Sequence, residues 1–262
     1  IGKLFEHSVE SFADRPAYES LGHRISFAEL ERLSRAFGRW LQDQGLVEGS
    51  RVAIMLPNCL QYPICVFGAL RAGYVVVNVN PLYTPRELAH QLSDSGAESI
   101  VVLENFAGVV AEALESLARA HSVRRIVVTR FGDLMGARGW LINLALKLLR
   151  KSVTPSRLPH TSFHTAIVEG RGLPLRGTKT SQDDLAFLQY TGGTTGTAKG
   201  AMLLHRNILA NLEQAAAWVR PFLDVSEQQV IITALPLYHV LSLTANCLLM
   251  MKLGGCNILI TD

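Results

Sequence analysis

The sequence has few cysteines, and none of them forms a pattern typical of a metal site or a redox pair. Cys59, Cys65, Cys247 and Cys256 include no CxxC pair, and each has apolar neighbours. Small thiols in such surroundings are commonly buried in a core, so we expect a structural role for all four. Unpaired thiols also suit a reducing compartment, and the cytoplasm is the predicted location.

Long apolar runs and strong charge are missing as well. No uninterrupted apolar run approaches the roughly 18–20 residues that cross a bilayer, and no secretion signal opens the chain. The formal net charge is +3 and the pI about 8.7, too mild to predict nucleic-acid binding. With 48% hydrophobic residues, the composition is that of a globular protein. Because it starts at Ile1 and ends in a strand-like run, residues 257–262, we expect the sequence to be a fragment.

Apolar β-branched runs alternate with helical patterns in the first half of the chain. Ser26 and Glu29 have the spacing of a capping box, and Thr84, Pro85 and Glu87 give a second, clearer helix start. The patterns predict helices at about 26–44, 62–71, 84–96 and 109–120, and strands at 52–56, 74–79, 100–103 and 125–129. This βαβα order predicts an α/β fold with a largely parallel sheet.

We expect two sheet lobes with flanking helices. The first lobe covers residues 1–180 and includes a surface excursion at about 130–180, which is rich in proline and small polar residues. The second lobe covers residues 181–262, carries a phosphate-binding loop and is incomplete. A lobe cut short leaves apolar surface uncovered, and a homodimer that covers it is left open.

The most informative segment joins two predicted strands, 185–190 and 201–204. Residues 189–200 read Gln-Tyr-Thr-Gly-Gly-Thr-Thr-Gly-Thr-Ala-Lys-Gly. Glycines let the backbone approach a ligand closely, and successive amides form a nest for anionic oxygens. The threonine hydroxyls and one lysine add further donors. The segment therefore predicts a triphosphate-binding loop, because its composition exceeds what a flexible turn requires.

This loop differs from the P-loop of common NTPases. In the P-loop the lysine is followed by Ser or Thr, and the loop runs into a helix. Here Lys199 lies between Ala198 and Gly200, and the loop connects two strands.

Residues 190–200 resemble the phosphate-loop signature of the adenylate-forming superfamily, which includes acyl-CoA synthetases, adenylation domains of peptide synthetases and luciferases. The form with Tyr-Thr-Gly-Gly and Ala-Lys-Gly is similar to bacterial long-chain fatty-acid–CoA ligases in particular, and so are residues 78–88 and 235–246. The resemblance runs from about residue 4 to the end. In two places the chain departs from it: Leu204 replaces a usual Thr, and residues 240–242 replace a more common Ile-Phe-Ala near the expected acyl pocket.

The resemblance implies ATP-dependent conversion of a long-chain fatty acid to acyl-adenylate and then to acyl-CoA, with Mg²⁺ bridging the phosphates. It assigns nucleotide binding to Thr191, Gly192, Gly193, Thr194, Thr195, Gly196, Thr197, Lys199 and Gly200. Thr194 is also the candidate metal ligand. His239 is the candidate catalytic residue and would orient the carboxylate and the α-phosphate, although a buried core histidine is left open. Tyr238 is expected to be a packing residue.

Several parts of the family machinery are absent from the sequence: the adenine- and Mg²⁺-contacting motif, the ribose-binding aspartate, the hinge and the lysine of the mobile C-terminal domain. We therefore expect the isolated chain to be inactive. Two other functions are left open. One is a ligase of the same superfamily for an aryl or other carboxylic acid. The other is a non-catalytic nucleotide-binding or membrane-adaptor module.

Residues 138–151 combine apolar and basic side chains. No acidic residue lies between Asp133 and Glu169, and the interval contains a tryptophan, several leucines and five basic residues: Arg138, Lys147, Arg150, Lys151 and Arg157. This composition suits a helix that lies on an anionic lipid surface, the inner face of the cytoplasmic membrane. An ordinary helix with its basic face in water is the alternative.

Overall fold

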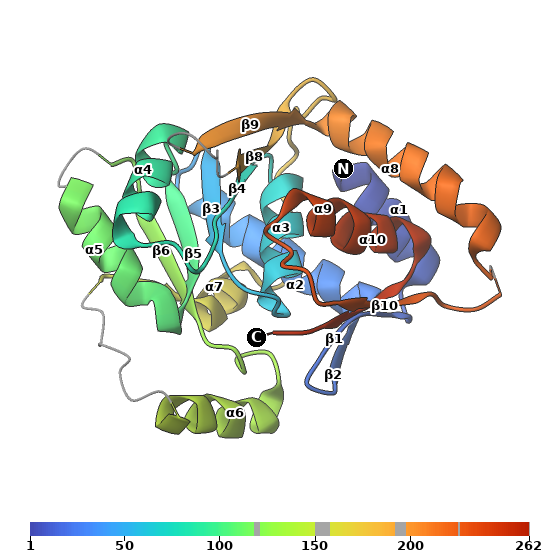
Figure 1. Cartoon of the computed structure of the whole chain (residues 1–262), viewed down its shortest axis with the longest axis horizontal. Helices are drawn as coiled ribbons and strands as arrows, with labels where there is room; N and C mark the ends of the chain where they lie inside the picture. The colour runs from blue at the N-terminus through green and yellow to red at the C-terminus, as the bar shows by residue number, and fades with distance from the viewer. Residues whose placement is uncertain (118–120, 150–157, 192–197, 225, 262) are drawn as a thin grey trace.

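The computed structural model describes residues 1–117, 121–149, 158–191, 198–224 and 226–261 (Figure 1). The predicted helix starts are confirmed. The Ser26 hydroxyl accepts a hydrogen bond from the Glu29 amide at 3.1 Å, and Thr84 and Glu87 form a complete capping box. The predicted α/β fold is confirmed too, because every strand pair but one in the larger sheet is parallel.

The larger sheet has seven strands in the order β7-β6-β5-β3-β4-β8-β9. Only β9 is antiparallel to its neighbour. The strands are β3 (Arg51–Met55), β4 (Val75–Asn78), β5 (Ser99–Leu103), β6 (Arg125–Thr129), β7 (Thr161–Ser162), β8 (Leu185–Thr191) and β9 (Lys199–Leu204).

Helices cover both faces of this sheet, as Figure 1 shows. One face packs against α2 (Phe27–Asp43), α3 (Gln61–Arg71) and α7 (Phe163–Gly170), and the other against α4 (Pro85–Ser95) and α5 (Ala107–Leu117). Val52 and Ile54 of β3 belong to the first core cluster, and Ala53 and Met55 to the second. This alternation follows from the two-residue period of a strand. Burial on both faces explains why the strands read as continuous apolar runs.

The smaller sheet has four strands in the order β10-β11-β1-β2. Its strands are β1 (Pro16–Ser20), β2 (His23–Ser26), β10 (Val230–Thr233) and β11 (Cys256–Leu259). The helices near it are α1 (Gly2–Phe12), α8 (His205–Val219), α9 (Val240–Ser242) and α10 (Leu249–Leu253), and α9 and α10 are joined by π-helical residues, Leu243–Leu248. Short 3₁₀ turns cover Glu104–Phe106 and Arg220–Phe222.

The two sheets do not divide the chain at residue 180, where we predicted the lobe boundary. β8 and β9 complete the sheet formed by the first lobe, whereas β1, which forms a hairpin with β2, pairs with β11 from the end of the chain. Tyr18 is the register partner of Asn257. The phosphate-loop segment therefore belongs to the larger sheet and does not begin a separate one.

The structural role expected for the cysteines is confirmed, because Cys59, Cys65, Cys247 and Cys256 are all buried and free. Burial raises the pKa of Cys59 and of Cys247 to about 12, which keeps both thiols protonated.

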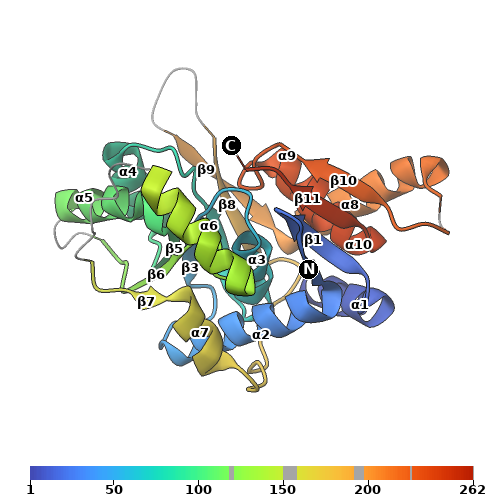
Figure 2. The ribbon, with the colours of Figure 1, turned by 90° about the horizontal axis from the view of Figure 1, so that it is seen from below.

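The predicted excursion at about 130–180 is only partly irregular. It contains β7, α7 and the helix α6 (Gly136–Leu149), which lies along one side of the molecule (Figure 2). Asn143 of α6 accepts a hydrogen bond from the Gly132 amide at 2.8 Å. The backbones of Gly132 and Gly139 are so close that a Cβ on either would collide with the other. Among the described helices, none has both the length and the apolar character that crossing a membrane requires.

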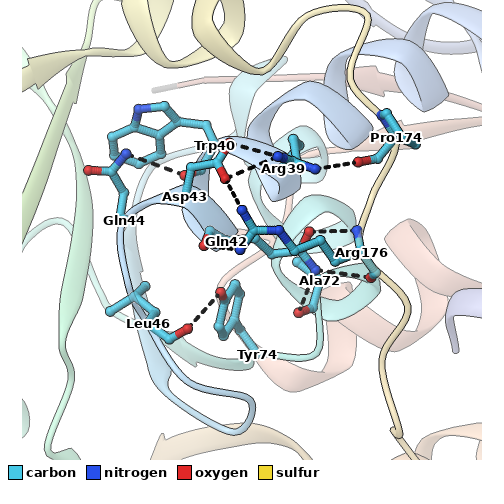
Figure 3. Close-up of polar contacts among 10 residues, drawn as sticks. All are labelled: Arg39, Trp40, Gln42, Asp43, Gln44, Leu46, Ala72, Tyr74, Pro174 and Arg176. Atoms are coloured by element: carbon cyan, nitrogen blue, oxygen red, sulfur yellow. Dashed lines mark hydrogen bonds and ion pairs between the residues drawn. The ribbon is translucent and has the colours of Figure 1, made fainter.

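The segment that leads from α7 to β8 is held against the end of α2 by side chains (Figure 3). The Gln42 side chain donates to the Arg176 carbonyl at 3.2 Å and accepts from the Arg176 amide at 2.8 Å. Arg39 donates to the Pro174 carbonyl at 3.1 Å. These side-chain hydrogen bonds satisfy backbone groups that a helix or strand would otherwise pair. The segment therefore has a defined conformation although it is neither a helix nor a strand.

Candidate active site

The carboxyl ends of the parallel strands of both sheets meet at one edge of the molecule. A cavity of about 410 Å³ lies there. Its wall includes Asn58 after β3, Leu82 after β4, Phe131 after β6, Ala234 after β10 and Ile260 after β11. Ligands of open α/β sheets bind at this edge, because the strand ends diverge into loops there. Ile142 and Leu146 of α6 close one side.

β8 and β9 bring the two ends of the predicted phosphate loop to the same edge. Thr191 pairs with Lys199, and Tyr190 with Gly200, so the loop does join two strands as predicted. Thr191 and Lys199 are exposed. A Cβ on Gly200 would lie 3.0 Å from the Tyr190 ring, so this position favours glycine. The other predicted nucleotide-binding residues lie outside the described residues: Gly192, Gly193, Thr194, Thr195, Gly196 and Thr197.

Helix α4 fixes both ends of this loop. Asp94 accepts a hydrogen bond of 2.5 Å from the Tyr190 hydroxyl, and His90 Nε2 lies 3.0 Å from the Ala198 carbonyl oxygen. Burial and then the bond to Asp94 raise the pKa of Tyr190, so its hydroxyl stays a donor. We did not predict from the sequence that His90 and Asp94 belong to the site. Their four-residue spacing on an amphipathic helix, which puts both on one face, was the available signal.

His239 lies at the start of α9 and is exposed. The alternative of a buried core histidine is therefore wrong. Its ring lies 4.6 Å, centroid to centroid, from that of Tyr238. Tyr238 is 9% exposed, lines the cavity and has its pKa raised by burial, in agreement with the packing role that we expected.

Buried side chains that we did not predict as site residues hold the backbone before His239. The Gln189 amide donates to the Tyr238 carbonyl at 2.8 Å. Asn58 accepts from the Leu237 amide at 2.8 Å. The available signal was an amide side chain inside or directly after an apolar strand, because a buried polar group needs a partner.

Among the described residues, no group of histidine, cysteine or acidic side chains has the arrangement of a metal site. The candidate metal ligand Thr194 lies outside them. The positive charge of Lys199 and the exposed hydroxyl of Thr191 are chemically suited to phosphate oxygens.

Comparisons with known proteins agree with this arrangement. The family model described as AMP-binding enzyme matches residues 5–262. A long-chain-fatty-acid–CoA ligase of Escherichia coli O157:H7 is 51% identical over 99% of this chain and 46% of its own length. One from Salmonella typhimurium is 50% identical with the same coverage. The solved apo structure of Mycobacterium smegmatis MbtA is 26% identical, with a TM-score of 0.79, over 100% of this chain and 44% of that chain.

The chain thus spans about half the length of the curated relatives that it matches. The family model covers nearly all of it. The described ends of the phosphate loop, Thr191 and Lys199, lie on the two strands β8 and β9, and Gln189 of β8 binds the residue before His239. The chain belongs to the AMP-binding enzyme family.

Proposed function

We propose that this chain forms part of an ATP-dependent long-chain fatty-acid–CoA ligase and is inactive by itself. In the first step a carboxylate oxygen of the fatty acid attacks the α-phosphorus of ATP, the bond to the bridging oxygen breaks, and pyrophosphate leaves. In the second step the CoA sulfur attacks the acyl carbonyl carbon, AMP leaves, and the thiol proton passes to solvent. The observation that carries the proposal is the hydrogen bond from Gln189, two residues before Thr191, to the Tyr238 carbonyl directly before His239, beside a cavity that Tyr238 lines.

The residues have separate roles in this proposal. The loop from Thr191 to Gly200 holds the β- and γ-phosphates, and Lys199 disperses the charge that develops on pyrophosphate. Mg²⁺, with Thr194 as candidate ligand, would supply further charge neutralisation. His239 orients the carboxylate and the α-phosphate.

The cavity is proposed to receive the acyl chain. Most of its wall is apolar, with contributions from Pro236, Leu259 and Phe131; the polar residues of the wall are Ser20, Asn58, Asn105, Tyr238 and Thr261. An alkyl chain gains free energy when it leaves water for such a surface, at about 25 cal/mol per Å². The carboxylate end would then point toward His239.

The test uses the full-length protein with ATP, Mg²⁺, CoA and a mixed panel of fatty, aryl and amino acids, with the thioesters identified by mass spectrometry. A dominant long-chain acyl-CoA supports the proposal. Aryl products would keep the mechanism and change the substrate class, whereas the absence of both thioester and AMP would overturn it. The His239→Ala substitution is expected to lower the rate of adenylate formation about 10²-fold.

We also propose that α6 contacts an anionic lipid surface on the cytoplasmic side. Trp140, Leu141 and Leu148 expose 66%, 58% and 75% of their surface. Arg138, three residues before Leu141 on the same helix, is exposed as well, and further basic residues follow in the sequence with no acidic residue before Glu169. Exposed apolar side chains beside basic ones favour binding in a lipid interface.

Co-sedimentation with phosphatidylserine-containing vesicles tests this contact. Trp140→Ser combined with Leu148→Ser should reduce the bound fraction several-fold, and charge reversal at Lys147, Arg150 and Lys151 should do the same at low salt. Trp218→Ser is the matched control, since Trp218 on α8 is 80% exposed. Binding that is equal for all of these variants would refute the contact.

A further inference from the structure

A continuous set of buried polar side chains connects the backbone before His239 to β8. The Gln189 amide donates to the Tyr238 carbonyl at 2.8 Å and accepts from the Asn78 amide at 3.0 Å. Asn78 in turn lies 2.8 Å from the Tyr62 hydroxyl, and that hydroxyl is also 2.8 Å from the Leu237 carbonyl. Tyr62, Asn78 and Gln189 expose 0%, 3% and 4% of their surface, so water does not replace these bonds.

Asn58 holds the other side of the same backbone. Its side chain accepts from the Leu237 amide and donates to the carbonyls of Thr233 and Leu235 at 3.0 and 3.1 Å. Residues 234–239 form neither a helix nor a strand. Their course is therefore set by amide side chains of the larger sheet and its adjoining loops, at the point where the two sheets meet.

We propose that Gln189, with Asn78 and Tyr62 behind it, is a positioning residue for adenylate formation. Gln189 lies two residues before Thr191, where the phosphate loop begins, and its amide binds the residue directly before His239. One side chain thus couples the location of the loop to that of His239. This inference rests on the proposed function and deepens it.

The chemistry of the position requires an amide. Gln189 donates through its nitrogen and accepts through its oxygen at the same time. A methionine of similar length can do neither. A glutamate can donate to the Tyr238 carbonyl only while it is protonated, and burial raises the pKa of a carboxyl group. The two substitutions therefore distinguish loss of packing from loss of the hydrogen bond.

The test measures ATP–pyrophosphate exchange by the full-length protein with a fatty acid that it accepts. Gln189→Met should lower kcat about 10–100-fold with the KM for ATP changed less than about threefold, because a displacement near 1 Å costs about that much in rate. Gln189→Glu should show the same loss at pH 8 and a partial recovery as the pH is lowered toward 6, because burial favours uptake of a proton by the carboxyl group. The wild-type protein should lack this recovery.

Gln42→Met is the matched control. Gln42 also has a buried amide that binds backbone, but it lies at the opposite edge of the sheet. A wild-type kcat in a folded Gln189→Met variant, or an equal loss in Gln42→Met, would overturn the inference. If Gln189→Met does not fold, Tyr62→Phe decides: a lower kcat at unchanged KM supports positioning, and an unchanged kcat refutes it. A wild-type protein that forms no adenylate with any acid would instead remove the proposed function itself.

Discussion

Gln42 and Gln189 both use a side-chain amide to hold an irregular stretch of backbone, but they do so at opposite edges of the seven-stranded sheet. Gln42 lies beside Ala72, just before β4 begins, and fixes Arg176 (Figure 3). Gln189 lies beside Asn78, where β4 ends, and fixes Tyr238. At the amino edge, Gln42 holds the connection that leads from α7 to β8. At the carboxyl edge, Gln189 holds the backbone directly before His239, in the candidate site.

The two anchors also differ in their surroundings. Arg176 is exposed, so water can reach the Arg176 backbone groups that Gln42 binds, although the Ala72 carbonyl is buried. At the carboxyl edge Gln189 binds the backbone of Tyr238, and Asn58 binds that of Leu237 and Thr233, all three of them buried residues; two further partners of Asn58, Leu235 and Ile260, are exposed. A lost bond to Arg176 is partly replaced by water, whereas a lost bond to the buried backbone of Tyr238 or Leu237 is not, so losing these bonds costs more at the carboxyl edge.

The largest effect on stability is expected for Asn58→Leu. Asn58 binds four backbone groups, those of Thr233, Leu235, Leu237 and Ile260, and is 4% exposed. Leucine fills the same space but satisfies none of them. The Thr233 and Leu235 carbonyls keep the Ile260 amide and the Ser242 hydroxyl as partners, whereas the buried Leu237 amide loses Asn58. An unpaired buried group costs about 1–3 kcal/mol and each other lost hydrogen bond about 0.5–1.5 kcal/mol, so the free energy of unfolding should fall by about 3–5 kcal/mol. Urea unfolding measures this, and a fall no larger than that of Gln42→Met would contradict the contrast between the edges.

Most of the secondary structure could be predicted from the sequence because its signals are local. Ser26 and Thr84 cap the helices that they were expected to cap, and Gly96 ends α4 in the left-handed conformation. The pairing of β1 with β11 and of β8 with β4 could not be predicted. Pairing such as that of Tyr18 with Asn257 joins residues far apart in the chain, and no local pattern records it.

The candidate site was predictable to the same extent. The phosphate loop and His239 carry a local composition or a family motif. Gln189 and Asn78 do not, since each is a single polar residue in an apolar strand, and its partner comes from another part of the chain. The rule that buried polar groups are paired indicates that a partner exists but does not say which one.

A smaller effect is expected for Gln42→Met. This change removes the bonds to Arg176 and to the buried Ala72 carbonyl, and water can replace part of those to Arg176. The free energy of unfolding should fall by about 1–2 kcal/mol, with kcat unchanged. Thermal unfolding and pyrophosphate exchange on one preparation measure both. A drop in kcat would show that the amino edge also affects the site.

The smallest effect is expected for Arg176→Met, which removes the 2.5 Å ion pair with Asp43. The Arg176 side chain is 57% exposed, and exposed pairs contribute little to stability. The hydrogen bond from Arg39 is the main reason why the pKa of Asp43 lies below its usual value, and Arg39 stays in the variant.

The stabilising effect of the Arg176–Asp43 pair should depend on pH, because the pKa of Asp43 is lowered in the folded protein. A carboxyl group whose pKa is lowered by folding stabilises the folded state above its unfolded pKa, and this contribution is lost as the pH falls through the folded pKa. The difference in thermal midpoint between wild type and Arg176→Met should therefore be measurable at neutral pH and low salt. It should shrink in acid, as Asp43 is protonated, and in high salt, which screens the pair. A difference that is constant in both series would mean that Arg176 acts through its bond to the Gln42 carbonyl, and so belongs with Gln42 in the amino-edge anchor.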